Sequence, residues 1–409
     1  MWAHVSAQDI GRSDFTSTYV GATLLRSGHR ADLYADSVQA AVHARLIAPD
    51  REGNLPFVDA PIAAALAAPV TLLSLDSAYR VWGLIQVGVL VAAVLIALSS
   101  APWPVRTPRL VTASTAIAAV AGAGTFVLLV QAQWTSVSAL GLALAYRDWR
   151  HDRLVRGAMF LTVSAGVAKP HLALALVAFM AGWRSRRVLA GALAGAGAVA
   201  AASVLLVGFS GLQGFALALT SSATRWDLAT FVSFIGLPAT VLGSGGAAQA
   251  AGVAGSVLLC GAAFCLGALI RADRGRLEPA LAGAATLSLL AAPHALLHDT
   301  VLLAPALVWS VAWAMRRSSA VVVLWGRVSI TPVAVVATCA LLVTAAGLAT
   351  VGGGALAVSQ GGALAPGAIV TPALLLAAAA AVAATRTPNL RVWNRAMHRR
   401  SRSRLARVS

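Results

Sequence analysis

Lysine is almost absent from this chain. All but one of its 31 basic residues are arginine, and the single lysine, Lys169, lies in the middle of an apolar stretch, residues 163–177. The arginine bias is typical of a high-GC genome. An ionisable residue at membrane depth marks a functional site by default, whereas the alternative is a helix-end lysine whose amine reaches the membrane interface.

Cysteine and acidic pairs are also scarce. The three cysteines, Cys260, Cys265 and Cys339, all fall in apolar runs and have no metal-ligand spacing, so we expect small buried apolar residues and no disulfide. No Asp-x-Asp pair occurs. The usual carboxylate clamp for a metal-bound nucleotide sugar is therefore missing, and we expect neither a metal nor a cofactor.

Charge as a whole is low, while apolar residues are abundant. Apolar residues make up 59 % of the chain, charged residues 11 %, and the mean hydropathy is +0.80. Runs of about 20 apolar residues with this composition predict an all-α polytopic membrane protein in contact with membrane lipids. The net charge of +17 comes from short arginine clusters between apolar runs. Such clusters mark cytoplasmic loops and do not indicate a nucleic-acid partner.

Three segments between arginine clusters must leave the cytoplasmic side and return to it. Residues 157–183 have room only for two arms of about 18 Å each, which predicts a broken or re-entrant hairpin at Lys169-Pro170-His171. The three hairpins raise polar apices toward the same, extracytoplasmic side. They cover residues 110–146 with an apex at 131–134, residues 157–183, and residues 277–315 with an apex at 293–299.

The other expected elements are five single spans and a long outer loop. The spans are residues 77–98, 188–207, 250–270, 331–351 and 366–384, and the loop is residues 208–248. Counting hairpin arms as crossings gives about eleven, an odd number, so the two ends lie on opposite sides.

This topology predicts three regions. They are an extracytoplasmic catalytic loop region at 1–76, a transmembrane bundle at 77–385 and a cytoplasmic arginine-rich tail at 386–409. Residues 60–75 are expected to lie along or dip into the membrane surface. A charged segment such as 1–76 needs a preceding span to cross the membrane, so we expect a first transmembrane helix encoded upstream.

Polar groups gathered at the outer mouth of a helical bundle predict a site for an anionic substrate presented from the membrane. A membrane-embedded enzyme fits this pattern. A transporter would also place ionisable residues at broken helices, but near the midplane and with an internal repeat, which the sequence does not show. A structural membrane protein would not need Lys169 and Gln133 in apolar arms.

A series of short motifs carries a family resemblance that extends to about Trp309. In chain order they are Asp14-Phe15, Tyr19, Gly28, Leu33-Tyr34, Gln39, Leu55-Pro56-Phe57, Pro61, Pro69, Trp82, Gln133, Lys169-Pro170, Pro293 and His298. Together they resemble the polyprenyl-phosphate-sugar-dependent glycosyltransferases of family 87, which are of the GT-C type. The chain departs from the family in having Asp59-Ala60-Pro61 for Tyr-Pro-Pro and Ala132-Gln133 for Gly-Gln, and in lacking the first transmembrane helix. The first two departures are expected to alter acceptor choice.

The resemblance implies a GT-C multi-helix bundle in the cytoplasmic membrane with an extracytoplasmic active site. Its known members are actinobacterial α-mannosyltransferases and arabinofuranosyltransferases of the cell envelope. We therefore expect an inverting enzyme that moves mannose from polyprenyl phosphate to a glycolipid or lipoglycan acceptor. Arabinofuranose remains the alternative donor sugar, because both sugars are neutral polyols.

The resemblance and the chemistry together assign roles to individual residues. Asp14 is expected to be the base that takes the proton of the acceptor hydroxyl, with a helix N-cap as the alternative. Lys169 and His298 are expected to stabilise the charge on the departing phosphate. The residues expected to bind donor or acceptor are Gln133, Tyr19, Tyr34, His171, His294 and Arg225; the histidines and Gln133 could instead serve only as buried packing residues.

Overall fold

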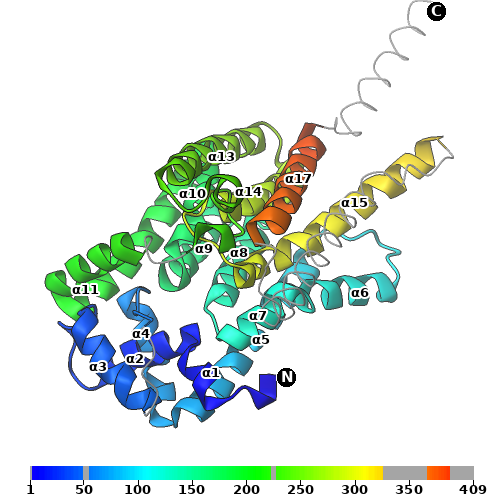
Figure 1. Ribbon diagram of the computed structural model, residues 1–409. Helices are drawn as coiled ribbons and strands as arrows, with labels where there is room; N and C mark the ends of the chain where they lie inside the picture. Colours follow the sequence, from blue (N-terminus) through cyan, green and yellow to red (C-terminus); the bar gives the residue numbers. More distant parts are fainter. Residues whose placement is uncertain (1, 49–54, 223–226, 326–365, 387–409) are drawn as a thin grey trace, which may run out of the picture.

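The structure is a computed structural model that describes residues 2–48, 55–222, 227–325 and 366–386 (Figure 1). Every regular element in these ranges is helical. The α-helices are α1 Ala7–Gly11, α2 Asp14–Arg26, α3 Asp36–Ile47, α4 Pro61–Ala67, α5 Leu75–Ser100, α6 Arg109–Val120, α7 Ala123–Gln131, α8 Thr135–Arg150, α9 Leu154–Ala168, α10 Leu174–Trp183, α11 Arg186–Ser222, α12 Gly236–Leu242, α13 Gly246–Ala272, α14 Leu277–Ala291, α15 Ala304–Trp325 and α17 Pro366–Arg386. The 3-10 helices are η1 Trp2–His4, η2 Ala68–Leu72, η3 Pro170–Ala173, η4 Leu228–Thr230, η5 Arg274–Arg276 and η6 Leu297–Leu303.

Five helices of the described ranges are long and apolar enough to cross a membrane, and the pair α6 and α7, bent by 44°, could form a sixth span. The five are α5, α11, α13, the continuous η6 and α15, and α17. Large apolar side chains on them face outward: Leu205 is 84 % exposed and Leu258 is 74 % exposed. The prediction of an all-α polytopic membrane protein is therefore confirmed.

Four of the five predicted single spans lie within α5, α11, α13 and α17, and the fifth, residues 331–351, lies outside the described residues. The expected number of crossings was too high for the described part, because it counted every hairpin arm. The arms α9 and α10 have only 15 and 10 residues. A membrane core of about 30 Å needs roughly 20 helical residues.

The predicted outer loop at residues 208–248 was wrong. Helix α11 continues to Ser222, α12 begins at Gly236 and α13 begins at Gly246. Gly208 has a φ of 72° and a ψ of −178°, so the chain kinks there and then resumes its helix, which only glycine does without strain. Cys265 on α13 is exposed and not buried as expected, and Cys339 lies outside the described residues. A small apolar residue on a membrane helix can face lipid as readily as protein.

The predicted break at Lys169 is confirmed. Pro170 disfavours helical backbone at the residue before it, and Lys169 has a φ of −149° and a ψ of 86° between α9 and η3. Ser288 of α14 compensates for the interrupted helix: its hydroxyl donates to the Leu172 carbonyl at 2.5 Å and accepts the Leu176 N–H at 3.4 Å. The freed backbone groups are thus satisfied by protein.

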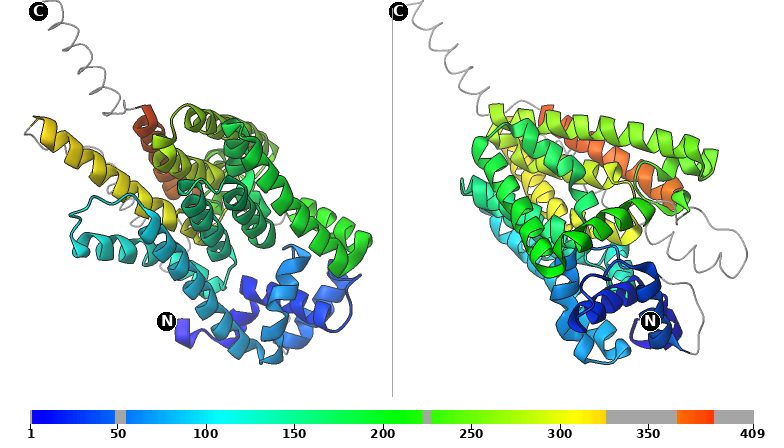
Figure 2. Two further views of the ribbon diagram at one scale, coloured as in Figure 1. Left: turned by 180° about the vertical axis from the view of Figure 1, so that it is seen from behind. Right: turned by 90° about the vertical axis from the view of Figure 1, so that its left-hand side faces the viewer.

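The helices form a bundle with a smaller group of N-terminal helices at one end (Figures 1 and 2). Within the bundle α8 packs on α5 and α9, α10 packs on α13, and α14 packs on α13 and α17. A second apolar core joins α2 and α4 to the start of α5 and includes Phe15, Phe57, Tyr79 and Trp134. The far end of α11 reaches this group, where Phe215 lies 5.5 Å from Tyr34 between ring centroids.

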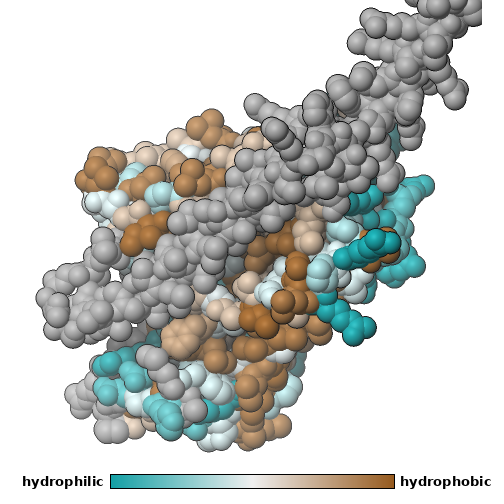
Figure 3. Space-filling view, turned by 90° about the vertical axis from the view of Figure 1, so that its right-hand side faces the viewer, coloured by the Kyte–Doolittle hydropathy of each residue, from teal (hydrophilic) through white to brown (hydrophobic). Residues whose placement is uncertain are grey.

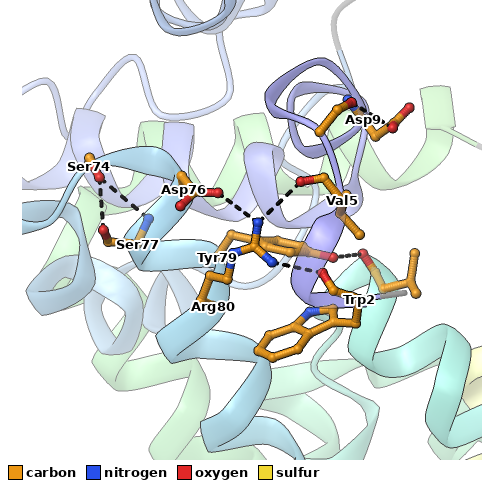
Figure 4. Close-up of polar contacts among 10 residues, drawn as sticks. Trp2, Val5, Asp9, Ser74, Asp76, Ser77, Tyr79 and Arg80 are labelled. Atoms are coloured by element: carbon orange, nitrogen blue, oxygen red, sulfur yellow. Dashed lines mark hydrogen bonds and ion pairs between the residues drawn. The ribbon is translucent and has the colours of Figure 1, made fainter.

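Arg80 of α5 fastens the start of the chain to the bundle (Figure 4). Its guanidinium donates to the carbonyl oxygens of Trp2 at 2.8 Å and Val5 at 3.2 Å, and to the Asp76 carboxylate at 3.0 Å. The neighbouring Tyr79 hydroxyl donates to the Val130 carbonyl at 2.7 Å. The N-terminal helices are therefore held by hydrogen bonds as well as by apolar contacts.

Two arginine clusters predicted to share one membrane side lie together. Arg274 pairs with Asp152 at 2.5 Å, which joins the loop after α8 to the loop after α13. Arg156 and Arg150 pair with the buried Asp148 and Glu278 at 2.5 and 3.2 Å. In Figure 3, hydrophilic side chains lie at the N-terminal end and at the right-hand edge of the face shown, with apolar side chains between them. This is the surface pattern of a protein that crosses a membrane.

Helices α10 and α13 pack closely because each has a glycine at the contact. A methyl group on Gly267 would lie 2.0 Å from the Phe179 carbonyl oxygen, and one on Gly182 would lie 1.9 Å from that of Phe264. Gly267→Ala should therefore push the two helices apart and lower the free energy of unfolding by roughly 1–3 kcal/mol. Thermal unfolding in detergent measures this. Gly261→Ala on the same helix, where the methyl group meets open space, is the control and should leave the melting temperature nearly unchanged.

Candidate active site

A cavity of about 360 Å³ lies where the N-terminal helices meet the bundle. All three predicted hairpin apices contribute to its wall, through Gln133, Lys169 and His298. The lining residues are Asp14, Ser17, Leu55, Pro56, Val58, Asp59, Gln133, Lys169, Pro170, His171, Leu219, Phe231, His294, Leu296, His298 and Asp299.

Asp14 is the first residue of α2, and its side chain points to another element. The carboxylate accepts a hydrogen bond of 2.5 Å from the Gln133 side-chain amide, and the Asp14 N–H donates to the side chain of Gln131 at 3.1 Å. Ser13 occupies the N-cap position. The alternative of Asp14 as a helix cap is therefore not what the structure shows: its carboxylate lines the cavity.

The turn that presents Gln133 is strained. Ala132 closes α7 with a φ of 48° and a ψ of 49°, the left-handed conformation that favours glycine. Trp134 holds the turn in place. Its indole N–H donates to the Thr18 hydroxyl at 3.2 Å, and its ring packs edge-on against Trp82 with ring centroids 4.7 Å apart. Glycine would adopt this conformation without strain, whereas Ala132 adopts it at a cost.

Lys169 is the cation of the cavity. Its side chain is 8 % exposed, and its ammonium donates to Asp299 Oδ1 at 2.8 Å and to His298 Nε2 at 2.8 Å. The interpretation as an amine that reaches outward to the interface is wrong, because the amine points into the protein and is paired there. The break before Pro170 is what turns the side chain toward η6.

Asp299 holds the cation in place, although sequence reasoning did not select it. Its Oδ1 also accepts from the Thr135 hydroxyl at 2.6 Å, and its Oδ2 accepts from the Leu296 N–H at 2.9 Å. One carboxylate therefore joins the break after α9, the start of α8 and the turn before η6. A buried lysine requires a counter-charge. Asp299, the acidic residue that follows His298 in the sequence, could have been identified on this ground.

The rings of His171 and His294 lie in contact on the cavity wall, tilted by 37° to each other. Their ring centroids lie 4.0 Å apart, and Phe231 lies 6.2 Å from His294. The buried His171 Nε2 has no hydrogen-bond partner among the described residues. Two flat rings and a free ring nitrogen form a surface that suits a sugar ring with its hydroxyl groups.

Asp59 is a second lining residue that was not selected as a site residue. Burial raises the pKa of its carboxyl to about 7; Lys169 opposes this shift, and the charges of Asp14 and Asp299 add to it. A carboxyl in that range is half ionised near neutral pH. The one sequence signal for Asp59 was that Asp59-Ala60-Pro61 stands where the resembled family has Tyr-Pro-Pro.

Two predicted binding residues, Tyr19 and Tyr34, do not line the cavity. The Tyr19 hydroxyl donates to the Leu73 carbonyl at 2.8 Å, and the Tyr34 hydroxyl donates to the Asp59 carbonyl at 2.7 Å, so each tyrosine fixes backbone of the N-terminal region. Direct binding of donor or acceptor by either tyrosine has no support from its position. Arg225 lies outside the described residues.

The cavity combines one ammonium group with three carboxyl groups and three imidazoles. Among the described residues, no group of three or more His, Cys, Asp or Glu side chains is arranged to hold a metal ion. Lys169 and His298 form a donor-rich side suited to an anion. Asp14 and Asp59 form an acceptor-rich side suited to hydroxyl groups and to removing a proton.

The strained turn gives a prediction about stability. Ala132→Val places a β-branched side chain in left-handed backbone and should lower the free energy of unfolding by about 2 kcal/mol. Ala132→Gly relieves the backbone but removes a buried methyl group, so it should stay within about 1 kcal/mol of the wild type. Thermal unfolding in detergent distinguishes the two variants. Equal melting temperatures for valine and glycine would mean that the turn is not left-handed.

The raised pKa of Asp59 gives a prediction about pH. The folded chain keeps a proton on Asp59 up to about pH 7, whereas the unfolded chain loses it near pH 4, so ionisation of Asp59 opposes folding. Stability should therefore fall as the pH rises from about 4 to 7 and level off above 7. Asp59→Asn should remove this component. Relative to the wild type, the melting temperature of Asp59→Asn, measured from pH 5 to 8.5, should therefore rise as the pH rises to about 7 and change little above that; a difference that does not change with pH would contradict it.

Comparison with known proteins gives one match. The model of glycosyltransferase family 87 matches residues 57–293, more than half of the chain. The matched part includes Asp59, Gln133, Lys169 and His171 of the cavity, while Asp14, His294 and His298 lie outside it. Neither curated proteins nor solved structures give a match. The family decides between the enzyme and the transporter that the residues alone left open: this chain is a membrane-embedded glycosyltransferase and belongs to family 87.

Proposed function

We propose that the protein transfers a sugar, mannose in the first instance, from polyprenyl phosphate to a hydroxyl group of a cell-envelope glycolipid or lipoglycan. The observation that carries this proposal is the division of one cavity into a cationic side at Lys169 and a carboxylate side at Asp14. A glycosyl phosphate has the complementary division, because its phosphate is anionic and the bond to be made lies at a neutral sugar carbon.

The donor phosphate binds beside Lys169 in this proposal. An ammonium group has three N–H donors, and Asp299 and His298 accept two of them. The third is left for a phosphate oxygen at the cavity. Because both existing bonds fix the amine, it needs little reorganisation when the phosphate gains charge in the transition state. Asp299 is then a positioning residue.

Asp14 acts on the acceptor. As the acceptor oxygen forms its bond to the anomeric carbon, its proton moves to the Asp14 carboxylate. The bond between the anomeric carbon and the phosphate oxygen breaks, and its electron pair leaves with the polyprenyl phosphate. The amide of Gln133, 2.5 Å from the carboxylate, orients this base. A single displacement inverts the anomeric carbon, so a β-linked donor gives an α-linked product.

The separation between the cavity and an arginine cluster along α8 supports the proposed side of the membrane. This helix begins at Thr135 beside the cavity and ends at Arg150 in an arginine cluster, and its 16 residues span about 24 Å. If the arginine clusters face the cytoplasm, we infer that the cavity lies toward the extracytoplasmic side of the membrane. A lipid-linked sugar is available there, whereas nucleotide sugars are cytoplasmic, and no cofactor or metal is required.

The first test concerns donor and base together. Membranes that contain the protein should transfer radiolabelled mannose from polyprenyl phosphate to lipid-extractable product, and Asp14→Asn should lower this rate by roughly 10² or more while the chain still folds. Asp32→Asn changes an exposed aspartate and serves as the matched control. Transfer of arabinofuranose in place of mannose would revise the donor sugar. Full activity in Asp14→Asn would remove Asp14 from the mechanism.

The second test separates the charge of Lys169 from its structural role. Lys169→Met leaves the Asp299 carboxylate buried without its cation, so this variant alone could fail to fold. Lys169→Met combined with Asp299→Asn removes both charges and should restore folding, seen as a single peak in size-exclusion chromatography. Transfer should remain at least about 10²-fold below wild type in this double variant. Recovery of transfer together with folding would show that Lys169 is structural only.

A further inference from the structure

Residues 55–59 form one wall of the cavity, and side chains that lie outside the cavity hold this segment in place. Four of them, Leu55, Pro56, Val58 and Asp59, line the cavity. The buried Gln39 side chain links this segment to the backbone at Leu33. Its amide group donates to the Leu33 carbonyl at 2.8 Å, and its oxygen accepts the Phe57 N–H at 2.7 Å. This segment is therefore a built wall and not a loose connection.

Two further contacts fix the end of this wall relative to α2. The Tyr34 hydroxyl donates to the Asp59 carbonyl oxygen at 2.7 Å, and its ring stacks on Phe57 with centroids 5.9 Å apart. Phe57 fills the space over Gly21 of α2, where even a methyl group would come within 2.6 Å of the ring. The helix that presents Asp14 and the segment that presents Asp59 are thus locked together.

The carboxyl groups of the cavity differ in how they are satisfied. Asp299 is bonded to Lys169, Thr135 and the Leu296 N–H, and Asp14 is bonded to Gln133. The Asp59 carboxyl has no hydrogen-bond or ion-pair partner among the residues that the structure describes, although it lines the same cavity. A preorganised acceptor with no protein donor is free to bind a donor from a ligand.

The chemistry of that ligand group follows from charge. A phosphate would be repelled by Asp59 and Asp14 and attracted to Lys169, which lines the same cavity. Neutral hydroxyl groups donate to a carboxylate without such repulsion, and two neighbouring hydroxyls can share its two oxygens. The position next to Asp14 belongs to the molecule whose hydroxyl loses a proton, which is the acceptor.

We propose that Asp59 is a specificity-determining residue that binds a hydroxyl group of the sugar acceptor next to the hydroxyl that Asp14 deprotonates. This inference rests on the proposed function. Asp59 thereby sets which acceptor hydroxyl faces the anomeric carbon. Tyr34 and Gln39, which do not reach the cavity, are the residues that hold it in register with Asp14.

The kinetic test compares Asp59→Ala, Asp59→Asn and the control Asp32→Asn. Loss of a hydrogen bond to a charged group should raise the KM for the acceptor about 10- to 100-fold in the alanine variant, with a smaller rise for asparagine, which keeps one oxygen acceptor. The KM for polyprenyl-phosphate mannose should stay within about twofold of the wild type. An unchanged acceptor KM, or a rise in the donor KM alone, would overturn the assignment.

A binding measurement keeps this inference distinct from the proposed function. Octyl α-mannoside is titrated into purified wild-type and Asp59→Ala protein without donor, and tryptophan fluorescence reports the dissociation constant. We expect weaker binding in the variant by the same factor as the rise in acceptor KM. Asp59-dependent binding without any transfer from polyprenyl-phosphate sugars would refute the proposed function and leave the role of Asp59 standing. Equal binding by both proteins, or none by the wild type, would refute that role.

Discussion

The site depends on the ion pair between Lys169 and Asp299. Removing either charge from water is costly, and the pair is stable only because hydrogen bonds from Thr135 and the Leu296 N–H satisfy the remaining carboxylate positions. These partners come from three separate hairpins. The pair therefore determines how the break after α9, the start of α8 and the turn before η6 meet, and the cavity is the space that remains where the N-terminal helices cover this junction.

The polarity of the cavity follows from this arrangement. The bundle supplies the cation and the imidazoles, whereas the N-terminal region supplies Asp14 from α2 and Asp59 from the segment before α4. Contacts such as those of Arg80 with Trp2 and Val5 keep the two parts together. Separate parts can thus carry separate tasks, with the lipid-linked phosphate on the bundle side and the acceptor on the N-terminal side, while the reacting atoms meet between them.

The sequence predicted those features that depend on local rules. Pro170 predicts the break at Lys169, apolar length predicts α5, α13 and α17, and the scarcity of charge makes Lys169 conspicuous. It did not predict α11 beyond Gly208, because one glycine can end a helix or only kink it. The sequence did not select Asp299, because its partner Lys169 is 130 residues away in the chain. It did not select Asp59 either, because the importance of Asp59 lies in its having no partner among the described residues. Tyr34 shows the converse: a motif residue that supports the wall of the cavity without reaching it.

The central claim is that one cavity binds the donor phosphate at Lys169 and directs the anomeric carbon toward Asp14. The most direct measurement is an experimental structure of the protein with a polyprenyl-phosphate sugar analogue that cannot be transferred. We predict a phosphate oxygen within hydrogen-bond distance of Lys169 Nζ, and the sugar between that amine and the Asp14 carboxylate. A phosphate bound among the arginines at the opposite end of α8, with the cavity empty, would contradict the account.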